Sequence, residues 1–228
     1  MVVGGYQNID KSQLIDVSSS TTCSNLPPYP LPLYGATGGV INGIPIICGG
    51  TTNGGRTNTC YSFEKTSNSW KLHCSLKSKR SHHASTVIND ALLITGGHDD
   101  GSILASTEFI YANGTTQSGP NMPVARWEHC MVTLHDGKVM ILGSYDPASL
   151  HKNVIIMDPA TNSFSSGPSL NYVRRDAGCT LFNSALHNGR PVVLAAGGYT
   201  TDTAEVYDYT NANQWETSII HFVFLLIM

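Results

Sequence analysis

Histidine is the residue type in this sequence that most often binds metals or transfers protons, and the chain has nine of them. None stands in a His-Glu-x-x-His pattern or in another tight cluster with metal-ligand spacing. His82 and His83 are adjacent, but neighbouring residues of a strand face opposite sides of its sheet. The sequence therefore predicts no metal site.

Patterns for an activated nucleophile or a phosphate-binding loop are also missing. There is no Gly-x-Ser-x-Gly turn and no Walker loop. Residues 49–55 are rich in glycine, but they lead into a predicted strand and not into the helix start that a phosphate site uses. We predict no catalytic residue, no cofactor and no enzymatic activity.

The composition of the chain argues against one class of fold and one class of partner. The chain has 228 residues, and only 13% are charged, about half of the roughly 25% usual in soluble domains. That scarcity argues against an all-α protein, because helix surfaces are built mainly from Glu, Lys and Arg. The net charge is −3 and no block of Lys and Arg occurs, which argues against nucleic acid as a partner.

A glycine pair that follows an apolar run recurs along the chain. The spacings from one first glycine to the next are 45, 47, 47 and 54 residues. Periods of this size are typical of propeller blades with four strands each. The copies are Gly4-Gly5, Gly49-Gly50, Gly96-Gly97, the degenerate Gly143-Ser144, and Gly197-Gly198.

Other residues recur in phase with the glycine pairs. An arginine precedes the first predicted strand of three repeats, at Arg80, Arg126 and Arg175. A tryptophan closes two repeats, at Trp70 and Trp215. The third predicted strand contains Glu and Tyr, as in residues 108–111 and 205–208.

Together these marks resemble the kelch repeat, from Met1 to about Glu216. The family pattern has an arginine before strand one, Gly-Gly ending strand two, a Glu/Tyr/Asp strand three, and a tryptophan in strand four. The resemblance implies an all-β, kelch-type β-propeller of about five blade-like repeats of four antiparallel strands. The repeats are about 1–26, which lacks its first strand, then 27–74, 75–121, 122–168 and 169–217.

Residues 218–228 form an apolar tail that none of the repeat marks explains. Two interpretations stay open. Either the chain is a fragment of a longer propeller, typically of six blades, or the tail supplies the missing strand and closes a ring of five.

The resemblance assigns structural roles to the recurring residues. The glycine pairs let the backbone turn and approach closely, the tryptophans fill space between sheets, and the arginines brace loops between blades. The predicted structural residues are Gly49, Gly50, Gly96, Gly97, Gly197, Gly198, Trp70, Trp215, Arg80, Arg126 and Arg175.

The resemblance also implies a function, because kelch propellers commonly hold a protein partner on their inter-strand loops. In family members that act as ubiquitin-ligase adaptors, the residue after Gly-Gly and the second residue after the arginine line the partner pocket. These positions here are Tyr6, Thr51, His98, Tyr145 and Tyr199, and His82, Glu128 and Ala177. We predict a protein-binding scaffold with Tyr6, His82, His98, Glu128, Tyr145 and Tyr199 in the contact surface. The adaptors place arginines at several such positions to hold acidic peptides, and this chain does not.

Actin binding and bundling is a further possibility that the family implies, and this sequence has no distinguishing residue for it. Two other functions stay open. One is an extracellular kelch recognition protein. The other is an enzyme similar to the copper radical oxidases of the galactose oxidase type, which need a Tyr–Cys cross-link, a second Tyr and two His. No such set can be placed in this sequence.

The six cysteines bear on the compartment. Cys48 ends strand two and Cys60 begins strand three of one repeat, so a cross-strand disulfide can form there, which would indicate an oxidising compartment. Cys130 and Cys179 occupy equivalent first-strand positions, where we expect small buried residues. A glycosylation sequon begins at Asn113, in a predicted turn.

Targeting signals do not decide the localisation. Residues 1–5 lack the basic and apolar regions of a secretory signal peptide. The apolar stretch 219–228 is half of the ~20 residues that span a bilayer. We expect no membrane span, and a chain that is cytoplasmic or, as part of a longer secreted parent, extracellular.

Overall fold

The computed structural model of this chain describes residues 2–3, 12–13, 26–145, 152–199, 201–211 and 214–218. This part of the chain is all-β, as predicted, apart from one 3-10 turn at Ala185–His187. Within these ranges no helix has the length and apolarity needed to cross a membrane. The chain forms two compact units, residues 1–127 and 128–228. Tyr6 and the tail at 219–228 lie outside the described residues.

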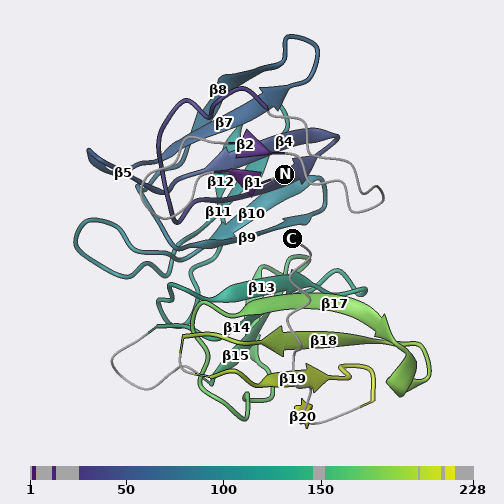
Figure 1. Ribbon diagram of the computed structural model, residues 1–228. Coiled ribbons are helices and arrows are strands. Elements are labelled where there is room, and N and C mark those ends of the chain that lie inside the picture. Colours follow the sequence, from purple (N-terminus) through teal and green to yellow (C-terminus); the bar gives the residue numbers. More distant parts are fainter. Residues whose placement is uncertain are drawn as a thin grey trace. The chain divides into compact units, whose positions relative to one another are not determined.

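The first unit contains two antiparallel sheets of four strands each (Figure 1). The first sheet consists of β3 (Thr37–Ile41), β4 (Ile44–Cys48), β7 (Thr59–Glu64) and β8 (Ser69–Ser75). The second consists of β9 (Ala84–Ile88), β10 (Ala91–Thr95), β11 (Thr107–Tyr111) and β12 (Thr116–Ser118). Two short pairs accompany them, β1 (Val2–Val3) with β2 (Ser12–Gln13), and β5 (Thr51–Thr52) with β6 (Gly55–Arg56).

The second unit repeats the plan with two more four-stranded sheets, each in sequence order. One consists of β13 (Cys130–Thr133), β14 (Val139–Leu142), β15 (Val154–Asp158) and β16 (Ser163–Ser166). The other consists of β17 (Gly178–Ser184), β18 (Arg190–Ala196), β19 (Ala204–Tyr207) and β20 (Glu216–Ser218). The four sheets of the two units therefore show one topology repeated along the chain.

In two of the four sheets the second strand is buried over its whole length. Every residue of β10 and of β14 is buried, as expected for strands that are covered on both faces and read as unbroken apolar runs. In the first unit, side chains of β3 and β4 pack with Leu92 and Ile94 of β10. In the second unit, Met140 and Leu142 of β14 pack with Val193 of β18. Each unit therefore has its core between the faces of two sheets.

The two tryptophans tie the last strand of a sheet to the segment that enters the same sheet. Trp70 in β8 donates from Nε1 to the carbonyl oxygen of Pro27 at 3.2 Å. Trp215, next to β20, donates in the same way to Pro168 at 2.9 Å. The indole rings pack edge-on or tilted against aromatic rings, Trp70 on Phe63 and Trp215 on Tyr207. An indole can fill apolar space only if its N–H finds an acceptor, and these carbonyls supply one.

The glycine pairs end the second strands with positive φ angles at Gly49, Gly50, Gly96, Gly97, Gly197 and Gly198. At Gly97, where φ is +92°, a Cβ atom would lie 2.8 Å from the Ser81 carbonyl oxygen and 2.8 Å from Cβ of His83. The N–H of the same residue donates to the Arg126 carbonyl oxygen at 2.8 Å. Both the backbone angle and the close packing therefore require glycine here.

We expect Gly97→Ala to lower the free energy of unfolding by about 3 kcal/mol. Two costs add up, because alanine is strained at this positive φ angle and because its Cβ atom would displace the neighbouring backbone. Gly43 is the matched control, because its φ is +77° and nothing lies within 4 Å of its Cβ position. Gly43→Ala should therefore lose only about 1 kcal/mol, the cost of φ alone. Urea unfolding of both variants measures the difference, and equal losses would contradict close packing at Gly97.

Candidate functional site

The glycine pairs at 49–50 and 96–97 lead into loops that bridge back to the segment before the first strand of the same sheet. Ser81 donates its N–H to the His98 carbonyl oxygen at 3.1 Å, and His98 donates to Ser81 at 3.0 Å. Tyr34 and Thr51 form the same pair of bonds in the preceding repeat. In the last sheet Tyr199 donates its N–H to the Arg175 carbonyl oxygen at 3.0 Å, so the residue after the glycine pair lies beside the residue after the arginine position in these three repeats. We call these paired segments the bridging loops.

A buried arginine holds the bridging loop of the sheet β9–β12. Arg80 is fully buried and pairs with the buried Glu108 of β11, with Nη2 2.7 Å from Oε1. Its guanidinium also donates to the carbonyl oxygens of Gly96 at 2.7 Å and Ser106 at 3.2 Å. Burial lowers the pKa of Arg80, and the Glu108 carboxylate opposes that shift. Arg80 is thus a structural residue that fixes the loop following β10.

The equivalent arginine of the last sheet is Arg174, which corrects the prediction of Arg175. Arg174 is fully buried and donates from Nε to Oε1 of Glu205 at 3.0 Å. Its Nη1 donates to the carbonyl oxygens of Gly197 and Thr203, at 2.7 and 2.8 Å. Arg174 and not Arg175 makes the contacts that Arg80 makes, because each of the two pairs with a glutamate of the third strand and donates to the carbonyl oxygen of the first glycine of a pair. Arg126 is buried at the corresponding position of the sheet β13–β16.

The second residue after each of these arginines has a left-handed backbone. The φ angle is +52° at His82, +54° at Glu128 and +53° at Asp176. Gly35 has φ +65° at the same position of the first full repeat. With Arg174 as the reference, Asp176 replaces the predicted Ala177 in this series. Three non-glycine residues held in a conformation that side chains rarely adopt mark a turn that the surrounding structure fixes.

The first unit gathers aromatic side chains on these loops, and we call them the His82 cluster. The His82 ring lies 5.9 Å from the Tyr34 ring and 5.7 Å from the Trp127 ring, both edge to face. His98 lies 5.1 Å from Trp127 in a tilted arrangement. These centroid distances are those of favourable aromatic pairs. The structure therefore brings the predicted His82 and His98 together, through a tryptophan that the sequence analysis did not assign.

The second unit has an arginine between two tyrosines, and we call this the Arg175 cluster. The Arg175 guanidinium carbon lies 4.6 Å from the centre of the Tyr145 ring and 3.8 Å from that of Tyr199. Nη1 lies 4.0 Å from Oε2 of Glu128. Burial and the Asp176 carboxylate raise the pKa of Glu128, and Arg175 opposes them. Three predicted contact residues, Glu128, Tyr145 and Tyr199, thus meet around Arg175.

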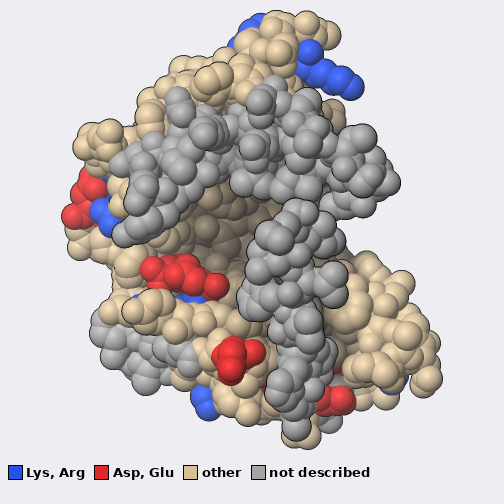
Figure 2. Space-filling model, in the orientation of Figure 1, with Lys and Arg blue, Asp and Glu red and all other residues tan. Residues whose placement is uncertain are grey.

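Exposure differs among the members of these clusters. Tyr199 is 75% exposed, although one face of its ring lies over Arg175. Arg175, Tyr145, His82, His98 and Trp127 are half-buried. Figure 2 shows that charged side chains are sparse on the face it presents, where most described residues are neither acidic nor basic.

The sequence analysis did not predict Tyr34, Trp127 or Arg175 as members of these clusters. All three stand directly after the arginine position, where Ser81 stands in the second repeat. The bridge to the residue after Gly-Gly makes this position part of the same surface. The sequence contains a signal for this position. When the repeats are aligned with Arg174 as the arginine of the last one, the residue after the arginine can be compared between repeats.

The cysteines form two disulfides among the described residues. Cys48 and Cys60 are joined across β4 and β7. Cys130 and Cys179 are also joined, which corrects the prediction that they are only small buried residues. The physical reason is that β13 and β17 lie side by side, with the two Cα atoms 6.1 Å apart. Cys74 of β8 faces Cys60, and burial raises the pKa of its thiol to about 11.

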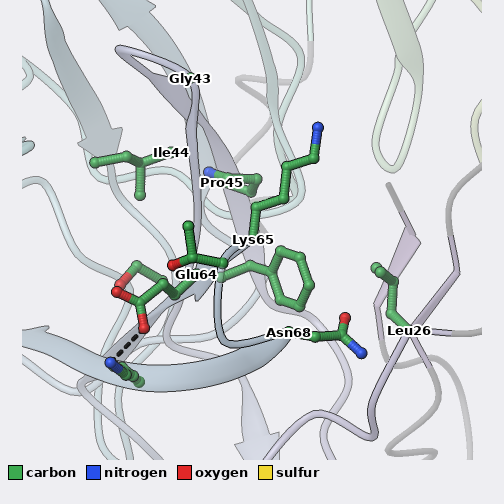
Figure 3. A pocket seen from close by; sticks show the side chains of 11 residues that line it. Leu26, Gly43, Ile44, Pro45, Glu64, Lys65 and Asn68 are labelled. Carbon is green, nitrogen blue, oxygen red and sulfur yellow. Dashed lines mark ion pairs between the residues drawn. The ribbon is translucent and has the colours of Figure 1, made fainter.

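A separate cavity lies at the opposite end of the first sheet, with a volume of about 740 Å³ (Figure 3). Its walls come mainly from the turn at Gly43, from Ile44 and Pro45 of β4, and from Phe63 of β7. Lys71 and Glu64 form an exposed ion pair at this cavity. None of the predicted contact residues lines it.

Chemistry of a catalytic kind finds little support in the described ranges. Across these ranges, no group of three or more His, Cys, Asp and Glu side chains is arranged to hold a metal ion. Glu128 has a raised pKa, but it pairs with Arg175 and lies beside no His, Ser or Cys that the structure shows as its partner.

Comparison with known proteins supports the fold. No family model matches the chain. A segment is 30% identical over 128 residues to Beta-scruin of Limulus polyphemus, covering 52% of this chain and 14% of the length of Beta-scruin. The solved structure of YjhT aligns with a TM-score of 0.75 at 12% identity, covering 95% of this chain and 85% of YjhT. The chain is kelch-like in sequence, and its fold is a kelch-type β-propeller.

Proposed function

We propose that the chain is a non-enzymatic propeller module of the kelch family whose bridging loops bind a protein partner. The observation that carries the proposal is the Arg175 cluster. A tyrosine that is 75% exposed, Tyr199, is held against an arginine that is itself fixed by Tyr145. Tyrosine and arginine are the residue types that dominate protein interfaces energetically.

The geometry favours binding over a purely structural role for these residues. The buried arginines Arg80 and Arg174 already brace the loops through carbonyl oxygens and a glutamate. Arg175 is not needed for that task, and stacking fixes its planar group at the surface. A side chain that is ordered before binding loses less conformational entropy when a partner arrives. The similarity to Beta-scruin and the propeller fold support the same proposal.

We expect Tyr199→Ala to weaken partner binding at least tenfold, as loss of an aromatic interface residue does, and to leave thermal unfolding unchanged. Arg175→Lys should weaken binding as well, because lysine keeps the charge but loses the planar stacking. The matched control is Leu186→Ala, since Leu186 is 89% exposed in the turn Ala185–His187, away from the bridging loops.

The measurement is quantitative affinity capture with the wild-type chain and the three variants, followed by titration of each captured protein. A partner that is lost with Tyr199→Ala and Arg175→Lys but kept with Leu186→Ala supports the proposal. If every captured protein binds the Tyr199→Ala variant as tightly as the wild type, the bridging loops are not the contact surface.

A second candidate function is recognition outside the cell, and the two disulfides favour it. Disulfides persist in oxidising compartments and are rare in the reducing cytosol. We expect Cys48, Cys60, Cys130 and Cys179 to resist alkylation in protein isolated from its natural source without reductant. Their full alkylation would place the chain in a reducing compartment.

A further inference from the structure

The turn between β11 and β12 contains the sequence Asn113-Gly114-Thr115. Asn113 and Thr115 are both exposed. Oδ1 of Asn113 accepts hydrogen bonds from the N–H of Thr115 at 3.0 Å and from its hydroxyl at 2.7 Å. Both of these bonds engage Oδ1, and the Asn113 residue as a whole is exposed.

The turn between β11 and β12 packs against the neighbouring sheet at Gly114. Gly114 has φ +83°, and its Cβ position lies 2.9 Å from the carbonyl oxygen of His73 in β8. The neighbouring sheet thus covers the turn at Gly114, while Asn113 is exposed. Two bonds close the turn, from Tyr111 N–H to Thr115 O at 3.0 Å and from Gly114 N–H to Tyr111 O at 2.9 Å. A group attached to Nδ2 would need no rearrangement of the fold.

The disulfides supply an independent observation about compartment. Cys48–Cys60 joins two strands of one sheet, and Cys130–Cys179 joins the first strands of two adjacent sheets. Both bonds require an oxidising environment during folding. In eukaryotic cells, the compartment that supplies this environment also attaches N-linked glycans to Asn-x-Ser/Thr sequences.

We propose that Asn113 is an N-glycosylation site of a chain that matures in the oxidising secretory compartment. The donor is a lipid-pyrophosphate-linked oligosaccharide. A bond forms between Nδ2 of Asn113 and C1 of the first sugar, and the bond from C1 to the pyrophosphate oxygen breaks. The pyrophosphate leaves with the bonding electrons, and Nδ2 loses one proton to a base of the transferring enzyme.

The position of Asn113 keeps a glycan away from the proposed binding surface of the first unit. Strands β10 and β11 pair from Thr95 with Thr107 at one end to Ala91 with Tyr111 at the other. The glycine pair and the His82 cluster follow the first end, and the turn with Asn113 follows the second. The glycan would therefore lie at the opposite end of these strands and leave the bridging loops accessible.

The experiment expresses the full chain behind a cleavable signal peptide in a eukaryotic cell line and compares its mass before and after peptide-N-glycosidase. We expect one glycan, with Asn113 converted to Asp by the enzyme. Asn113→Gln and Thr115→Ala should abolish the mass shift, and Thr115→Ser should retain it. Asn162→Gln is the matched control, because Asn162 is exposed in the corresponding turn of the sheet β13–β16 but lacks the Ser/Thr.

Non-reducing peptide mapping of the same material tests the compartment. Glycan at Asn113 together with both disulfides supports the proposal. A chain whose signal peptide has been removed and whose Asn113 is unmodified overturns the site, whether or not it is secreted. A glycosylated chain whose four cysteines are reduced overturns the assignment of compartment. Partner binding by the Asn113→Gln variant should equal that of the wild type, so failure here is distinguishable from failure of the binding proposal.

Discussion

Replacing Glu205 by alanine is expected to lower the free energy of unfolding of the second unit by about 3–5 kcal/mol. Arg174 and Glu205 are both fully buried, so the variant leaves a guanidinium in the core without its counter-ion. Glu205 also accepts hydrogen bonds from the N–H groups of Asn171 and Tyr172. A buried N–H group that loses its acceptor destabilises the protein by the full free energy of its desolvation. Urea unfolding followed by tryptophan fluorescence measures the loss.

Two further variants make this test specific. Glu216→Ala removes a carboxylate that is 62% exposed and lies 3.6 Å from His187, and it should leave unfolding unchanged because exposed pairs contribute little. The double variant Arg174→Met with Glu205→Leu should recover part of the stability, since apolar residues of similar size often replace a buried pair without loss, whereas the N–H groups of Asn171 and Tyr172 still lack the Glu205 acceptor. A loss below 1 kcal/mol for Glu205→Ala would show that the pair does not support the loop.

Removing the Cys130–Cys179 disulfide is expected to cost about 4 kcal/mol, because a bond that closes a loop of this length restricts the unfolded chain strongly. The two cysteines are separated by 49 residues in sequence, and Cys48 and Cys60 by only 12. The chain-entropy relation predicts about 3 kcal/mol for the shorter loop. The double alanine variant at 130 and 179 should therefore be the less stable of the two.

The measurement is chemical unfolding of both double variants and the wild type without reductant. Unfolding of all three in excess dithiothreitol is the control, since their stabilities should then converge. A larger loss for the 48/60 pair would contradict loop closure as the main source of stabilisation.

The repeat architecture could be predicted because its determinants are local. Gly96-Gly97 at a strand end, Arg80 before a strand and Trp70 in the last strand each act on backbone within or next to one sheet. Such residues recur at a fixed period, and the period is visible in one sequence. The predicted contact residues His98, Tyr145 and Tyr199 could be placed on one kind of loop for the same reason.

Two parts of the site could not be predicted from the repeat marks. Arg174 and Arg175 are adjacent in sequence. Which of them is buried is decided only in the folded chain, where Arg174 forms an ion pair with Glu205. The disulfide between Cys130 and Cys179 depends on how the first strands of two sheets approach each other, which periodicity does not reveal. In both cases the deciding contact is with a residue that lies far away in the chain.

One recurring hydrogen bond has a consequence for synthesis of the chain. The second residue of a glycine pair donates its N–H to the carbonyl oxygen of the next repeat's arginine, from Gly50 to Arg80 at 2.8 Å and from Ser144 to Arg174 at 3.0 Å. Domains fold as the ribosome releases them, from the amino end onward. The loop after β4 therefore acquires its acceptor only once Arg80 has emerged, and the loops after β10 and β14 depend in the same way on Arg126 and Arg174 of the repeats that are translated after them.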